Sequence, residues 1–209
     1  MNIFVLDKNP IIAAQMQCDA HIRKMVMESC QILSTTHRFL DGTAIATKTK
    51  KGRSITIYEL NEAREFLLKA THINHPCVKW ARESSDNYNW LYQHFVALLA
   101  EFKFRYNHPH CYEKYIDILS QLPNNMPSKQ KTDFAQCMPD QYKNKDIVVA
   151  YRNYYNGEKM GFAKWVKSRD QPLWIKNYLI EKMIRSSMVT AKEAGDNLIK
   201  LNKILQNHE

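Results

Sequence analysis

Glycine and proline are scarce in this sequence. Its 209 residues include 5 glycines and 7 prolines, and long stretches contain neither. Because these residues mark turns and breaks, their scarcity favours helices with few tight hairpins. It also leaves little material for a backbone phosphate cradle, and neither a P-loop nor a G-x-G-x-x-G motif occurs. Nucleotide-dependent phosphoryl transfer is therefore not expected.

Long apolar runs are also missing. No apolar stretch approaches the ~20 residues needed to span a bilayer, and no signal peptide is recognisable. The five cysteines, at positions 18, 30, 77, 111 and 137, are scattered and odd in number. This usage indicates free thiols in a reducing, cytoplasmic setting, which for a viral protein is the host cytoplasm, and no membrane partner.

The sequence also lacks the ligand spacings that are typical of metal sites. The stretches "HINHPC" (72–77) and "HPHC" (108–111) place histidine and cysteine close together. Zinc sites usually present C-x2-4-C or H-x3-5-H pairs in a set, and neither arrangement occurs here. The sequence therefore predicts neither a metal nor another cofactor.

Positive charge, in contrast, is in excess. The chain has 30 basic and 21 acidic residues, which gives a formal net charge of +9. Such an excess suits a polyanionic partner, because phosphate contacts release condensed counterions. The stretch "TKTKKGR" (47–53) is either a solvated basic loop or a loop that faces phosphate. We expect DNA or a nucleotide as the partner, and the sequence carries no signal for an oligomeric state.

The pattern of apolar residues predicts a mainly α-helical protein. We expect a compact multi-helix domain over residues 1–170, with a short N-terminal arm, and a helical C-terminal extension over 171–209. The apolar run "NIFVL" (2–6) is either a brief strand or an extended arm packed on the body. Helical patterns cover 11–38, a short segment from Pro76, 85–107, 111–122, part of 138–159, and 172–207 with an optional break near Gly195. Residues 41–54 form a loop or a small hairpin.

The stretch "CDAHIRKMVMESCQ" (18–31) carries the clearest candidate site. On a helix, His21, Lys24, Glu28 and Gln31 form one stripe, since positions three and four apart are neighbours. A carboxylate with a cation one turn away and a histidine two turns away suits general acid–base chemistry, or stabilisation of an oxocarbenium-like centre. The alternative is the solvated face of an amphipathic helix.

Two further groups of polar residues accompany this stripe. On the predicted helix 85–107, Asn87, His94, Glu101 and Arg105 are spaced by seven, seven and four residues. If this helix packs beside the first one, the two polar seams face each other across a groove; alternatively, Glu101 and Arg105 simply pair on the surface. The stretch "YRNYYNGEK" (151–159) begins with Tyr151 and Arg152, a composition that fits contact with unstacked bases or sugars. Its alternative interpretation is an aromatic cluster in the core.

The motif Asp19-x-His21, followed by Glu28 on the same helix, resembles the pyrimidine-dimer DNA glycosylases of the phage endonuclease V type. The motif lies close behind a short N-terminal arm, as in that family. Weaker likeness continues in "EFKFR" (101–105) and in "MPDQYK" (138–143) with "AYRNYY" (150–155). The resemblance implies a phage protein with a compact helical domain, in which the N-terminal amine lies between helices.

The resemblance also implies an activity and roles for residues. The family cuts the glycosidic bond of a damaged pyrimidine in DNA and then nicks the sugar by elimination. Glu28 matches the catalytic carboxylate, His21 matches the active-site histidine, and Met1 would supply the amine. An α-amine, with a reference pKa of roughly 7.7–8.0, is partly neutral at pH 7 and can attack the sugar carbon. The residues expected to bind substrate are Asp19, Lys24, Gln31, Asn87, His94, Arg105, Arg152 and Tyr151.

Three positions differ from the family pattern. Asn2 stands where the family has a small residue that is exposed when the initiator methionine is removed. Met27 and Gln31 stand where dimer-cleaving members carry arginines that grip the damaged strand. Two other functions therefore stay open: a non-catalytic DNA-binding or host-interaction protein on the same scaffold, and an enzyme that acts on a free nucleotide or modified base.

Overall fold

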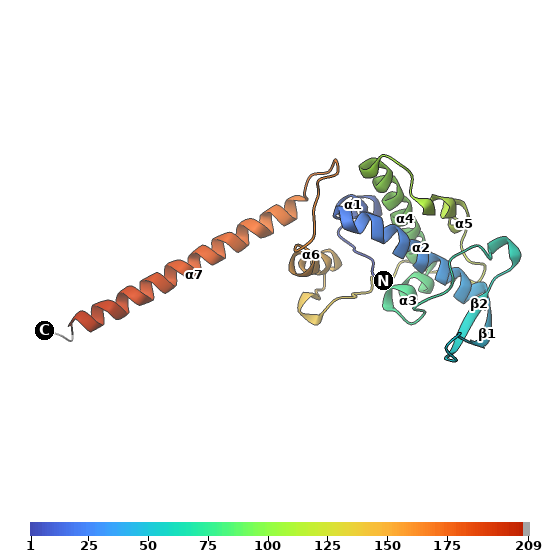
Figure 1. Cartoon of the computed structure of the whole chain (residues 1–209), viewed down its shortest axis with the longest axis horizontal. Helices are drawn as coiled ribbons and strands as arrows, with labels where there is room; N and C mark the ends of the chain where they lie inside the picture. Colours follow the sequence, from blue (N-terminus) through green and yellow to red (C-terminus); the bar gives the residue numbers. More distant parts are fainter. Residues whose placement is uncertain (207–209) are drawn as a thin grey trace. The chain divides into compact units, whose positions relative to one another are not determined.

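The computed structural model describes residues 1–206. The chain forms two compact units, Met1–Asp170 and a second that begins at Gln171. Over the described residues the protein is mainly α-helical, with one small two-stranded sheet (Figure 1), which confirms the predicted fold class. The helices are α1 (Pro10–Gln15), α2 (Asp19–Asp41), α3 (Pro76–Glu83), α4 (Ser85–Tyr106), α5 (Ile116–Leu119), α6 (Ile147–Glu158) and α7 (Leu173–Gln206). None of them is long and apolar enough to cross a membrane.

The N-terminal arm packs on the body of the first unit without forming a strand. Residues 1–9 contain neither helix nor sheet. Ile3, Phe4, Val5 and Leu6 are nevertheless buried, so the apolar run is held by side-chain burial instead of strand pairing. Of the two forms expected for "NIFVL", the extended arm is the one observed.

The helix predicted over 11–38 is in fact two helices, and Arg105 explains the break. Helix α1 ends at Gln15 and α2 begins at Asp19. The guanidinium of Arg105 donates hydrogen bonds to the backbone carbonyls of Gln15 and Gln17, each at 2.8 Å, and to the Asp19 carboxylate at 3.0 Å. Carbonyls at a helix end need partners when they are buried. A residue ninety positions away supplies them here, so the local pattern gave no sign of the break.

Helix α2 lies in the middle of the first unit. It packs against α3 and α4, and α4 also packs against α1. Apolar side chains such as Ile22, Val26 and Leu33 on α2, and Phe95 and Leu98 on α4, are fully buried. Helix α2 is covered on several sides, so His21 and Glu28 of its polar stripe are buried, whereas Lys24 stays exposed.

The segment predicted as a loop or small hairpin is a hairpin. Strand β1 (Thr43–Lys48) pairs antiparallel with β2 (Ser54–Glu59), with Ile45 opposite Ile57. At its tip Gly52 adopts a φ of 78°, a left-handed conformation that glycine tolerates without strain. The hairpin extends from the lower right of the body in Figure 1.

The remaining helices follow the predicted order with two differences. Helix α4 begins after Ser84, whose side chain accepts from the backbone N–H of Asp86, as an N-cap does. The helix predicted over 111–122 is a 3-10 turn (Cys111–Tyr115) followed by the short α5, and the Leu119 carbonyl accepts from the Tyr88 hydroxyl at 2.9 Å. Helix α7 continues through Gly195, so the optional break does not occur.

Candidate active site beneath the N-terminal arm

Glu28 lies where the N-terminal arm crosses α2. The backbone N–H of Asn2 donates to Glu28 Oε2 at 2.9 Å, and the Met1 amine nitrogen lies 4.0 Å from the same oxygen. Lys24 Nζ lies 3.4 Å from Oε1, and its side chain is 62% exposed. Glu28 itself is only 8% exposed. A buried carboxylate is thus placed beside a primary amine, with one exposed cation at the rim.

The Asn2 side chain fixes the arm in this position. Its Nδ2 donates to the Cys137 carbonyl at 2.9 Å, and its Oδ1 lies 3.0 Å from the Tyr151 hydroxyl. Tyr151 is fully buried and lies 2.7 Å from the Ala135 carbonyl as well. Asn2, the bulky departure from the family pattern, therefore serves to clamp the arm. Tyr151, expected to touch substrate, is buried and contacts Asn2 and Ala135, and its contact with substrate stays a prediction.

His21 forms part of the wall under the arm. Its ring stacks on Phe4 with centroids 4.5 Å apart, and Tyr155 meets it edge-on at 5.1 Å. Burial, together with the positive charges of Lys159 and Lys24, lowers the pKa of His21 to about 3. The imidazole is therefore neutral at pH 7. Among the described residues, nothing bonds to its buried Nδ1.

Asp19 and Arg105 belong to a buried ionic network. Arg105 donates to Asp19 at 3.0 Å and to Glu101 at 2.6 Å, and Arg169 donates to both oxygens of Glu101 at 2.8 Å. Their charges are neutralised inside the fold. Glu101 and Arg105 do pair, but inside the fold and not on the surface as the alternative had it. That Asp19 and Arg105 bind substrate stays a prediction.

Asn87 and His94 also lie inside the fold, and substrate binding by them stays a prediction. Asn87 is fully buried and donates to the Trp80 carbonyl and to Thr132, each at 2.8 Å. His94 lies between the Pro10 carbonyl, 2.8 Å from Nδ1, and the Gln17 side chain, 3.1 Å from Nε2. Within residues 1–206, the polar partners of Glu28 come from the arm and Lys24, not from α4. The predicted groove between the two seams is not formed.

Gln31 and Arg152, which were also expected to bind substrate, lie in different parts of the structure. Gln31 Nε2 donates to the Lys69 carbonyl at 2.6 Å on the exposed side of α2. Arg152 donates to the Leu6 carbonyl at 3.0 Å, and so holds the end of the arm.

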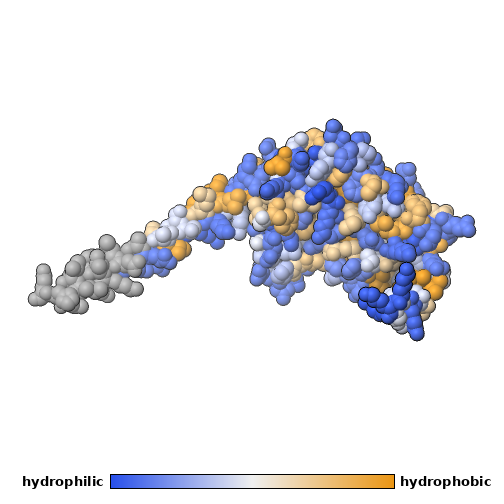
Figure 2. All heavy atoms as spheres, in the orientation of Figure 1, coloured by the Kyte–Doolittle hydropathy of each residue, from blue (hydrophilic) through white to orange (hydrophobic). Residues whose placement is uncertain are grey.

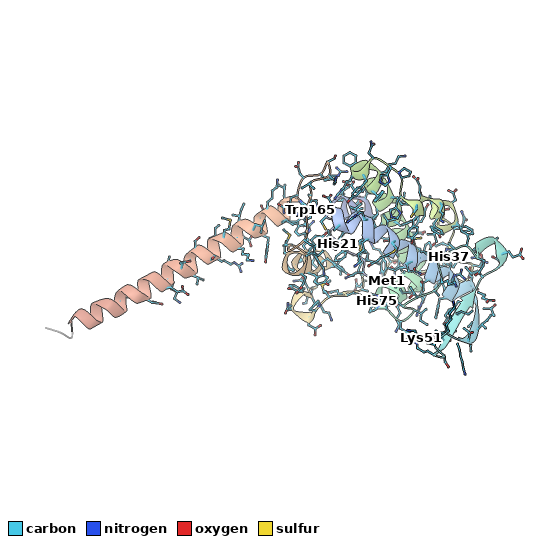
Figure 3. The ribbon with its side chains drawn as sticks, in the orientation of Figure 1. Met1, His21, His37, Lys51, His75 and Trp165 are labelled. Atoms are coloured by element: carbon cyan, nitrogen blue, oxygen red, sulfur yellow. The ribbon has the colours of Figure 1, made fainter. Side chains whose placement is uncertain are left out.

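In Figure 3 Met1 and His75 lie close together. The pKa of His75 is lowered mainly by burial and next by the positive charge of the N-terminal amine. The sequence did not indicate roles for Phe4 or Cys137 here, because Phe4 reaches His21 from the arm and Cys137 contacts Asn2 across 135 residues.

The buried histidines predict sensitivity to acid. Burial lowers the pKa of His94 to about 4, whereas a histidine in an unfolded chain titrates near 6.5. The unfolded chain therefore takes up the proton first. Between about pH 6.5 and pH 4 the free energy of unfolding should fall as the pH falls, by up to about 1.4 kcal/mol per pH unit for each such histidine. Urea unfolding across this range measures the slope.

A matched pair of variants isolates the contribution of His94. His94→Gln keeps one donor and one acceptor but cannot titrate, so the slope should become shallower. His108 is exposed, and His108→Gln should leave the slope as in the wild type. Equal slopes in the wild type and in His94→Gln would contradict a neutral, buried His94.

A comparison with known families covers the part of the chain that contains Met1 and Glu28. The family model described as pyrimidine dimer DNA glycosylase matches residues 1–113, which is more than half of the 209 residues. The chain belongs to the pyrimidine dimer DNA glycosylase family. The resemblance seen in Asp19-x-His21 and Glu28 is thereby confirmed at the level of the family, and DNA is the substrate that this family implies.

The matched part of the chain contains the arm, α1 to α4 and the hairpin. It therefore includes Met1, His21, Lys24 and Glu28, whereas Tyr151 and other residues after 113 lie outside it. Neither the search of curated proteins nor the search of solved structures found a match.

Proposed function

We propose that this protein removes a damaged pyrimidine from DNA and then cleaves the strand at the resulting abasic site. The observation that carries the proposal is the pairing of the Met1 amine with the buried carboxylate of Glu28, 4.0 Å apart. An amine can form an iminium with the sugar, and a nearby carboxylate stabilises the positive charge that develops. Membership of the glycosylase family supports the same chemistry.

Each atom has a place in the proposed reaction. The neutral amine nitrogen bonds to C1′ of the nucleotide as the bond between C1′ and the base breaks, and the base leaves with a proton. As the bond between C1′ and O4′ breaks, O4′ takes up a proton from solvent and becomes a hydroxyl, and an iminium cation forms beside Glu28. Glu28 then removes a proton from C2′, and the bond between C3′ and its oxygen breaks to release the phosphate. Water hydrolyses the iminium and restores the amine.

Access to C1′ requires a nucleotide to leave the stack. This displacement costs a few kcal/mol, which contacts to the backbone must offset. Lys24 is positioned for such a contact, because its exposed ammonium lies at the rim beside Glu28. In this proposal His21 is a positioning residue, whose neutral ring supports Phe4 and the arm and does not transfer a proton.

The hairpin supplies a second basic surface for DNA. Lys48, Lys50, Lys51 and Arg53 are exposed at its tip, and none of these four pairs with an acidic group in the part of the chain that the structure describes. Figure 2 shows hydrophilic residues gathered at this end of the molecule. Unpaired cations are free to neutralise phosphates.

Neutralising the hairpin should flatten the salt dependence of DNA binding. Each phosphate contact contributes a slope of about −0.9 to log affinity against log salt. Replacing the four hairpin cations with glutamine should make the slope shallower by about 2 to 4 units, as measured by fluorescence anisotropy on duplex DNA. The control replaces four other exposed cations: Lys103, Lys114, Lys129 and Lys145. A hairpin variant with the wild-type slope would show that the hairpin does not contact the backbone.

Two DNA substrates test the proposed activity directly. One duplex carries a single pyrimidine dimer and the other carries a single abasic site, and strand products are separated on a denaturing gel. The proposal expects strand cleavage at the abasic site and base release at the dimer. An intact abasic duplex after incubation with excess folded protein would contradict it.

A further inference from the structure

Three side chains that bind metals converge beneath the N-terminal arm. His75 precedes α3, Cys77 lies in its first turn, and Cys137 comes from the segment before α6. Their potential ligand atoms all lie within 4.8 Å of one another. The two sulfur atoms are 3.3 Å apart, and the Cys77 thiol donates to Cys137 Sγ. His75 and Cys77 belong to the stretch "HINHPC" (72–77), but Cys137 lies sixty residues after Cys77, so the sequence did not show the full set.

The spacing of these atoms is close to that of a zinc site. With Zn–S bonds of about 2.3 Å, the two sulfurs of a tetrahedral site lie ~3.8 Å apart. His75 Nδ1 accepts from the Cys77 backbone N–H at 3.2 Å, and an ion bound through this nitrogen would replace that hydrogen bond. Shifts of side chains by about an ångström would bring all three atoms to bonding distance.

The three residues would leave a bound ion partly open to solvent. Cys77 is buried, whereas His75 and Cys137 are half-buried. Two thiolates and an imidazole select soft or borderline ions such as Zn²⁺ over Mg²⁺ or Ca²⁺, which prefer oxygen. Three protein ligands leave one position of a tetrahedron for a fourth ligand.

We propose that His75, Cys77 and Cys137 form a binding site for a divalent ion of the zinc class. Such an ion would join α3 to the segment around Cys137. That segment also holds the arm, because the Cys137 carbonyl accepts from Asn2 Nδ2 at 2.9 Å, and Cys77 Sγ lies 3.7 Å from Asn2 Oδ1. The site is distinct from the Met1 and Glu28 pair, and its occupancy does not depend on glycosylase activity.

Cobalt is the probe for this site. The reduced full-length protein is titrated with Co²⁺ in a phosphine reductant, and absorption is recorded. We expect one equivalent to give a thiolate-to-cobalt charge-transfer band and the d–d bands of a tetrahedral ion, both removed by one equivalent of Zn²⁺. The absence of these bands in the folded wild type would overturn the proposal, and so would a mass two hydrogens lower that reveals a disulfide despite the reductant.

Variants assign the ligands. Cys137→Ser, at a half-buried position, should remove the charge-transfer band or weaken Co²⁺ binding at least tenfold, and His75→Ala should do the same. Cys77→Ser serves as a third test if circular dichroism shows that it folds. The control is Cys111→Ser, because Cys111 is exposed and lies 3.9 Å from His110 Nδ1. Loss of the band in Cys111→Ser, or its survival unchanged in Cys137→Ser, would contradict the assignment.

Discussion

Replacing Glu28 with glutamine should lower strand cleavage at an abasic site by about 10²–10⁴-fold, the range of a removed general acid or base. Glutamine keeps the shape of the side chain and can still accept the hydrogen bond from the Asn2 N–H, which is 2.9 Å long in the wild type. It removes the negative charge that faces the iminium and the base that takes the C2′ proton. The loss should therefore appear in the rate of cleavage under single-turnover conditions.

Affinity for DNA should change little in the same variant. Glu28 is 8% exposed, and the cations that would contact phosphate are Lys24 and the hairpin residues. The control is Glu113→Gln, which changes an exposed carboxylate on the 3-10 turn and should cleave like the wild type. Thermal unfolding of both variants shows whether the fold is intact. Full cleavage by folded Glu28→Gln would remove Glu28 from the chemistry.

Blocking the N-terminal amine should abolish cleavage. Acetylation of Met1 removes the nucleophile and its positive charge, while the Asn2 N–H can still bond to Glu28. The arm is held in one position, because Asn2 Nδ2 donates to the Cys137 carbonyl at 2.9 Å and Asn2 Oδ1 lies 3.0 Å from the Tyr151 hydroxyl. Cleavage and DNA binding are measured on the same preparation, and we expect only cleavage to be lost.

A second test moves the amine instead of blocking it, with the same residue added at the other end of the chain as the control. One extra glycine ahead of Met1 moves the amine away from Glu28, whereas one extra glycine after the last residue leaves it in place. The first should fail to cleave and the second should match the wild type. Equal activity of the two chains would mean that the amine at the start of the arm is not the nucleophile.

Local patterns were sufficient where local contacts decide the structure. Ser84 caps α4 through its own neighbour Asp86, and the apolar stripe with Phe95 and Leu98 is buried as its spacing predicted. The break between α1 and α2 could not be read in the same way. Its cause is Arg105, which reaches the Gln15 and Gln17 carbonyls from another helix.

In the candidate site, too, local spacing predicted some contacts and could not predict others. Spacing placed Lys24 next to Glu28 on one face of α2, and the structure has them 3.4 Å apart. The period of a helix shows which residues share a face but not what covers that face. The partners of His94 come from α1 and the turn after it. A seam that looked like a substrate surface is therefore internal.

Trapping with borohydride tests the central claim most directly. Borohydride reduces an iminium between protein and sugar to a stable amine, so the wild type incubated with an abasic duplex should give a one-to-one covalent complex. Mass spectrometry of the digested complex should place the sugar on the peptide that begins at Met1. Lys24 is the other amine near Glu28, with Nζ 3.4 Å from Oε1, and Lys24→Arg should still be trapped. The absence of a complex, or a sugar attached to Lys24 instead of Met1, would contradict the account.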